Sequence, residues 1–205
     1  MLFLIYSIII YRMGHIKEFF NLKNAKAAFG PRGLALMGVM LACAYVLNSV
    51  ATIYITPSYR LVSIAYLPDV ITGALLGPWA ALAFGFAADT VKYLAKPAGP
   101  WFPGYALSEM ATCFIYAAAF YKREKTGVVR TVLRALLAQL AVLIFVTMGL
   151  NYLWDTLMYG GKASEFFAAG RMINRAAQYP AHAALVAATA RLAYLISGRT
   201  GLFKK

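Results

Sequence analysis

Charged residues are scarce in this chain: Asp, Glu, Lys and Arg make up only 13% of its 205 residues. An ordinary globular domain carries roughly 25%. Hydrophobic residues fill 62% of the sequence, and a soluble fold of this size has too little polar surface to cover so much apolar material. This scarcity argues against a soluble domain and predicts an all-α integral membrane protein.

Cysteine and histidine are also sparse, with two of each. Cys43 and Cys113 fall inside apolar stretches without C-x-x-C spacing, which favours packing over a disulfide or a metal site. His15 and His182 are isolated from each other and from any Cys or Glu at ligand spacing. No Walker A motif occurs. We therefore expect no metal ion, no cofactor and no ATP hydrolysis by this chain.

Acidic residues are rarer than basic ones: 7 Asp and Glu stand against 20 Lys and Arg, a net charge of +13. In a soluble chain this excess would suggest nucleic-acid binding. Here the basic residues cluster between apolar stretches, as they do in the cytoplasmic loops of membrane proteins. The distribution predicts two cytoplasmic termini and a lipid bilayer, not a nucleic acid, as the partner.

Six apolar segments are candidates for transmembrane helices, which need about 20 residues each. They cover residues 34–51, 63–76, 79–94, 105–121, 132–153 and 173–196. We expect loops around residues 56–60 and 96–104, and a tight turn at Gly77-Pro78, because proline suits the first position of a helix. The predicted organisation is an N-terminal apolar stretch with a basic amphipathic interfacial segment (1–32), followed by a six-transmembrane-helix bundle (33–205).

Four acidic side chains fall within or near these spans: Asp69, Asp89, Glu109 and Asp155. Each costs about 2.5–3.5 kcal/mol at the centre of an inserted helix, so each should face a cavity or a partner. Lys92 follows Asp89 by three residues on the same helix face, and we expect these two to pair. The predicted topology places the acids at one outer level, together with basic and aromatic side chains. The layer is either an interfacial aromatic belt or, as we favour, a pocket for a small molecule, whose basic residues suit a ligand with carboxylates.

Small residues four positions apart indicate close helix packing. The first span offers Gly38-x-x-x-Ala42, and the pairs Gly73/Gly77 and Ala81/Gly85 match the same pattern. Because alanine-rich helices make this signal weakly specific, we expect most of these pairs simply to pack the bundle.

Four motifs resemble a known family: RLVSIAYLP at 60–68, GALLGPW at 73–79, GFAAD at 85–89 and PAGPWFPGYAL at 97–107. Together they resemble the folate-specific S component of energy-coupling-factor (ECF) vitamin transporters. The resemblance covers residues 34–121 well and continues weakly through 171–180. The glycine-proline string before the fourth span is its most specific part.

The resemblance implies a six-helix protein of the prokaryotic plasma membrane that binds folate on the outer face. It would deliver the vitamin by docking to a transmembrane coupling subunit, which works with two ATP-hydrolysing subunits. Gly38 and Ala42 would form the docking motif, with glycine replacing the family's usual first alanine. The candidate ligand-binding residues are Arg60, Tyr66, Asp69, Asp89, Lys92, Trp101, Phe102, Tyr105, Glu109, Arg175 and Gln178.

Two other functions remain open at this point. The cargo could be another vitamin or a precursor, such as a pyrimidine, riboflavin or pantothenate, because related S components share an architecture with little residue identity. An intramembrane enzyme would need a nucleophile with a base or a metal cluster. Ser108-Glu109 has no histidine at the same predicted depth, so we expect no enzyme.

Overall fold

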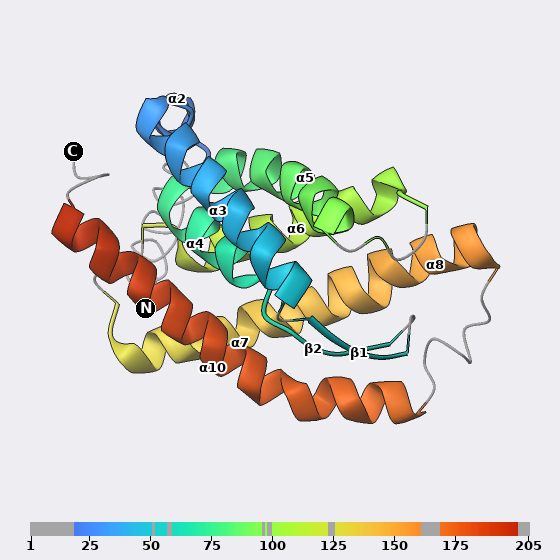
Figure 1. Cartoon of the computed structure of the whole chain (residues 1–205). Helices are drawn as coiled ribbons and strands as arrows, with labels where there is room; N and C mark the ends of the chain where they lie inside the picture. Colours follow the sequence, from blue (N-terminus) through green and yellow to red (C-terminus); the bar gives the residue numbers. More distant parts are fainter. Residues whose placement is uncertain are drawn as a thin grey trace, which may run out of the picture.

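The structure is a computed structural model that describes residues 19–50, 52–56, 59–95, 97, 100–122, 126–160 and 169–200. This part of the chain is almost entirely helical (Figure 1). Its elements are α2 (Leu22–Ala28), α3 (Pro31–Val50), β1 (Thr52–Thr56), β2 (Tyr59–Ser63), α4 (Leu67–Leu76), α5 (Pro78–Ala95), α6 (Pro103–Phe120), α7 (Val128–Ala141), the π-helix η1 (Val142–Leu150), α8 (Asn151–Tyr159) and α10 (Ala169–Thr200).

Three helical segments are long and apolar enough to cross a membrane: Pro31–Val50, Val128–Met158 and Ala177–Gly198. Their outer faces carry large apolar side chains, of which Val46, Phe145 and Leu195 are 55%, 68% and 61% exposed. Such exposure is unfavourable in water but natural in lipid, where apolar side chains face hydrocarbon. The fold is therefore that of a helical membrane protein, and these three segments coincide with the first, fifth and sixth expected spans.

The helices α4, α5 and α6 occupy the segments expected for the second to fourth spans. At 1.5 Å per residue, the ten residues of α4 reach only about 15 Å, half the thickness of a bilayer core. The 18-residue helices α5 and α6 carry charged residues of the bundle interior, such as Lys92 and Glu109. Buried aromatic side chains such as Phe84 and Tyr116 pack between these helices.

Two glycines allow the backbones of these helices to approach closely. A Cβ on Gly73 would lie 2.9 Å from the backbone nitrogen of Ala117, and one on Gly85 would lie 2.7 Å from Cα of Met110. Both positions therefore pack α4 and α5 against α6, as the small-residue spacing predicts. Gly38 differs, because a Cβ there would meet no atom within 4 Å.

The expected loop after the first span is instead an antiparallel β hairpin. Strands β1 and β2 pair Ile53 with Val62 and Tyr54 with Arg60, with irregularities in the register. The β-branched residues of this segment favour extended backbone, a local signal too short to have been recognised as two strands. The side chains of the hairpin, including Arg60, lie outside the described part.

The two boundaries marked by proline form as expected, with one adjustment. Gly77 adopts φ 86° at the end of α4, a conformation that favours glycine, and α5 begins at Pro78. Helix α6 begins at Pro103, so residues 103–104 are helical rather than part of the expected loop. Proline again occupies the first helical position, where its missing N–H costs nothing.

The long helical stretch from α7 to α8 is interrupted by nine residues of π-helix, η1. Its wider turn, with i→i+5 hydrogen bonds, is rare and frequently lies beside a functional site.

Near the N-terminus, Phe19 and Phe20 pack against Phe114 of α6, and the Phe20 ring also contacts that of Trp79. Residues 1–18, which hold the expected apolar stretch and the start of the basic interfacial segment, lie outside the described part.

Candidate functional site

A buried ion cluster joins three helices. Lys92 of α5 places Nζ 2.9 Å from Oδ2 of Asp69 on α4 and 2.5 Å from Oε1 of Glu109 on α6. The Asp69 side chain is fully buried, whereas Lys92 and Glu109 keep 15% and 23% of their side-chain surface exposed. Two carboxylates around one ammonium leave an excess negative charge when all three are ionised. Glu109, the most accessible of the three, can therefore accept a hydrogen bond from a ligand.

A fourth helix fixes the position of the lysine. Asn48 of α3, itself buried, donates a hydrogen bond from Nδ2 to the backbone carbonyl of Lys92 at 2.8 Å. Helices α3, α4, α5 and α6 thus meet around this one residue. The cluster therefore connects these four helices and places charged groups in the interior of the bundle.

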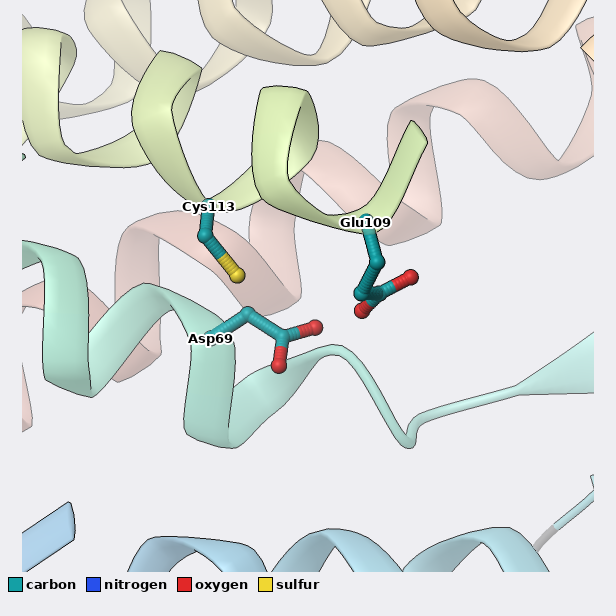
Figure 2. Close-up of side chains that lie close together, drawn as sticks. All are labelled: Asp69, Glu109 and Cys113. Carbon is teal, nitrogen blue, oxygen red and sulfur yellow. The ribbon is translucent and has the colours of Figure 1, made fainter. Parts of the chain in front are cut away.

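Figure 2 shows the side chains of Asp69, Glu109 and Cys113 pointing toward one another. The atoms of these side chains that could bind a metal ion all lie within 4.8 Å of one another. Carboxylate and thiolate groups can bind metal ions. Here, however, Nζ of Lys92 already hydrogen-bonds both carboxylates, and a second cation would meet its positive charge. The geometry therefore favours an ion-pair cluster over a metal centre.

The predicted pairing of Asp89 with Lys92 is wrong. Lys92 reaches into the bundle toward Asp69 and Glu109, and Asp89 instead accepts a hydrogen bond from Nε1 of Trp101 at 3.2 Å. The spacing places both side chains near each other on α5 but does not reveal that two carboxylates on other helices compete for the ammonium. Asp89 therefore helps to hold the loop that precedes α6.

Aromatic side chains from α6 and α8 form a second part of the site. Tyr105 donates its hydroxyl to Asp155 at 2.5 Å, and Trp154 donates its indole N–H to Oγ of Ser108 at 3.1 Å. The ring of Phe102 packs edge-on against those of Tyr105 and Trp154. Ser108 thus serves as a hydrogen-bond acceptor for Trp154, and no histidine contacts it within the described residues, as a nucleophile would require.

Several buried polar atoms have no hydrogen-bond partner among the described residues. They include the Tyr66 hydroxyl, Nε2 of Gln178, Nε2 of His182 and Oδ1 of Asn151. The rings of Tyr66 and His182 lie 5.2 Å apart. A buried polar group left unsatisfied costs about 1–3 kcal/mol, so each of these is suited to a hydrogen bond from a bound ligand or an ordered water.

The structure brings together most of the predicted site residues in these groups. Arg175 and Gln178 both lie on α10, half-buried, and Arg60 lies on β2, with its side chain outside the described part. Sequence reasoning missed His182, which it treated as isolated, and Asn151. The sequence signal that could have identified His182 is its position four residues after Gln178, which puts both side chains on one face of a helix.

These features define a class of protein: a helical membrane protein whose interior holds an ion cluster together with polar and aromatic side chains. Residues 32–199 match the family described as "ECF transporter, substrate-specific component". The chain belongs to this family, whose members are substrate-binding components of transporters rather than enzymes.

Two relatives are informative. The chain is 28% identical over 131 residues to the folate transporter FolT of Clostridium novyi (strain NT), a match that covers 64% of this chain and 72% of the relative. The fold of this chain is similar to that of the crystal structure of FolT bound with folic acid, with a TM-score of 0.68 and 29% sequence identity. That match covers 79% of this chain and 93% of the other.

Proposed function

We propose that this chain is the folate-binding S component of an ATP-driven ECF importer in a prokaryotic plasma membrane. The observation that carries the proposal is the likeness to a folate-bound FolT structure, at 29% identity over 79% of the chain. Folate has two carboxylates, an aromatic linker and a pterin ring. Basic, aromatic and unsatisfied polar side chains are all present in the interior of the bundle. Each part of the vitamin therefore has a chemical counterpart in this chain.

Calorimetric titration of the purified chain with folate tests this proposal. We expect one folate per chain with a dissociation constant below about 1 μM, without ATP and without partner subunits. Riboflavin, thiamin and pantothenate serve as controls and should give no heat at the same concentrations. Binding heat from one of these vitamins, with none from folate, would identify that vitamin as the cargo instead of folate.

We further propose six membrane crossings, formed by α3, α4, α5, α6, the α7–η1–α8 stretch and α10, with both termini in the cytoplasm. In this topology Gly127 lies inside and Gly160 outside. Single cysteines at these two positions, in a background without Cys43 and Cys113, would be labelled from opposite sides by an impermeant maleimide. Labelling of both from the same side would contradict the topology.

The docking face for the coupling subunit is proposed on α3, at Gly38 and Ala42. Both residues are exposed, and a Cβ on Gly38 would meet no atom within 4 Å. Their lack of bulk leaves a shallow surface beside the exposed side chains of Val39 and Val46. A helix of the coupling subunit could approach closely there, as helices in membranes do over small residues.

Leucine at Gly38 or Ala42 should block this approach without disturbing the ligand site. We expect folate affinity within a few-fold of the parent, but loss of ATP-dependent uptake and of co-purification with the coupling and ATP-hydrolysing subunits. Ala184→Leu, an exposed small-to-large change on α10, is the matched control and should transport normally. Normal uptake by both α3 variants would exclude this docking face.

A further inference from the structure

Positive charge is concentrated around the start of α7. The segment 121–150 holds a single acidic residue, Glu124. Its basic residues are Lys122, Arg123, Lys125, Arg130 and Arg134. Helix α10 adds Arg191 and contains no acidic residue. Because one carboxylate neutralises only one cation, these segments together carry a clear excess of positive charge.

Two of these arginines converge on one residue. Nη1 of Arg134 on α7 donates a hydrogen bond to Oγ1 of Thr126 at 3.2 Å, and Nη1 of Arg191 on α10 donates to the backbone carbonyl of Thr126 at 2.9 Å. The start of α7 therefore lies beside α10, as Figure 1 also shows. Both arginines are half-buried. The two acceptors are uncharged oxygens, so these bonds orient the guanidiniums without neutralising them, and each guanidinium keeps further N–H groups for an anion.

The fold holds this arginine pair in place. The buried hydroxyl of Tyr194, three residues after Arg191 on α10, donates to the carbonyl of Phe120 at 2.7 Å. This bond fixes the end of α6 against α10, and the hydroxyl of Thr131 donates to the carbonyl of Gly127 in the first turn of α7. The two guanidiniums therefore belong to packed helices, which keeps them in a fixed arrangement.

An exposed apolar ridge runs beside the arginines. Val129, Leu133 and Leu137 follow one another at four-residue spacing along α7, so they form one stripe, and all three are exposed. Arg130 and Arg134 each directly follow a member of this stripe. Because α7 begins the Val128–Met158 segment, which is long and apolar enough to cross a membrane, the ridge faces the hydrocarbon of the bilayer.

We propose that Arg134 and Arg191 bind the phosphate of an anionic phospholipid, and that an acyl chain of this lipid lies along the ridge of Val129, Leu133 and Leu137. Guanidiniums match phosphate oxygens in both charge and hydrogen-bond geometry. A soluble anion would use the arginines alone, whereas a lipid uses the charged and the apolar surface together. The inference goes beyond folate binding and does not depend on the cargo. In the proposed topology the lipid belongs to the cytoplasmic leaflet, whose negative surface attracts basic residues near the membrane.

Native mass spectrometry of the purified chain, mixed in detergent with equal amounts of phosphatidylglycerol and phosphatidylcholine, tests the charged part of this site. The two lipids carry the same acyl chains, and only phosphatidylglycerol has a net negative charge. We expect the parent to retain one phosphatidylglycerol with about a fivefold preference. Arg134→Gln combined with Arg191→Gln should weaken phosphatidylglycerol binding about tenfold and remove the preference.

Lys26→Gln combined with Arg32→Gln is the matched control, because it removes the same charge from exposed positions on α2 and α3. It should retain phosphatidylglycerol like the parent. Thermal unfolding identifies any variant that is simply misfolded. Arg191→Lys, which keeps the charge and loses the planar fork, then provides a second test and should bind with an intermediate affinity.

The apolar part is tested by Leu133→Ser combined with Leu137→Ser. This variant should weaken phosphatidylglycerol about tenfold, because the acyl chain loses its apolar contact. Inorganic phosphate in large excess should not displace the lipid from the parent, since phosphate has no apolar part.

Equal retention of the two lipids by the parent would overturn the proposal, as would a preference for phosphatidylglycerol that survives in the double arginine variant. Displacement by inorganic phosphate, together with parent-like lipid binding in the leucine variant, would show that the arginines bind a soluble anion instead. Calorimetric titration should give parent-like folate affinity in all of these variants, so failure of the lipid site is distinguishable from failure of the proposed function.

Discussion

Removing the ammonium at the centre of the ion cluster is the most severe single change that the structure suggests. Lys92→Met keeps a long side chain but leaves the carboxylates of Asp69 and Glu109 without their shared cation. Loss of one partner from a buried ion pair costs about 3–5 kcal/mol, because the remaining charge is unpaired. Here two carboxylates remain and Asp69 is fully buried. We therefore expect the free energy of unfolding to fall by about 4–5 kcal/mol.

Equilibrium unfolding in mixed detergent micelles, followed by tryptophan fluorescence, measures this loss. Lys26→Met, at an exposed lysine of α2, is the matched control and should change stability by less than about 0.5 kcal/mol. Adding Asp69→Asn to Lys92→Met should restore about 2 kcal/mol, because only the partly exposed Glu109 then stays charged. Equal stability of Lys92→Met and the parent, or no recovery in the double variant, would refute the reasoning.

Three further predictions follow from single contacts. Gly85→Ala should lower the free energy of unfolding by about 2 kcal/mol, because its methyl would fall 2.7 Å from the backbone of α6, whereas Gly38→Ala should be neutral or slightly stabilising in the same assay. Tyr105→Phe should lower the free energy of unfolding by about 1.5–3 kcal/mol, because the hydrogen bond to Asp155 is lost. If adding Asp155→Asn lowered the free energy of unfolding by the same amount again, the two side chains would not interact. Arg60→Ala should weaken folate binding about ten- to a hundredfold in a calorimetric titration, and an unchanged affinity would place this arginine outside the site.

Local sequence signals were sufficient where a residue acts on its own neighbours. Gly77-Pro78 correctly marks the boundary between α4 and α5, because glycine's positive φ and proline's fixed φ act within two residues. The glycines of α4 and α5 correctly indicate close packing. The apolar segments likewise indicate the long helices, since composition alone determines which of them suit lipid.

The sequence alone does not predict contacts between helices that are distant along the chain. Helical spacing predicts that Lys92 pairs with Asp89, but tertiary packing brings two carboxylates to its ammonium and gives Asp89 to Trp101. His182 has no polar partner nearby along the chain, because its neighbour Tyr66 directly precedes α4 and is distant in sequence. The acidic residues of the site were still identifiable, because a charge within an apolar segment needs a partner wherever that partner lies.

The most direct test of the central claim is mass spectrometry of the small molecules that co-purify with the chain from its native membrane. A high-affinity folate-binding component should retain folate, or a reduced form of it, through purification, and Arg60→Ala should retain much less. Recovery of a different vitamin from the parent, in place of folate, would contradict the account.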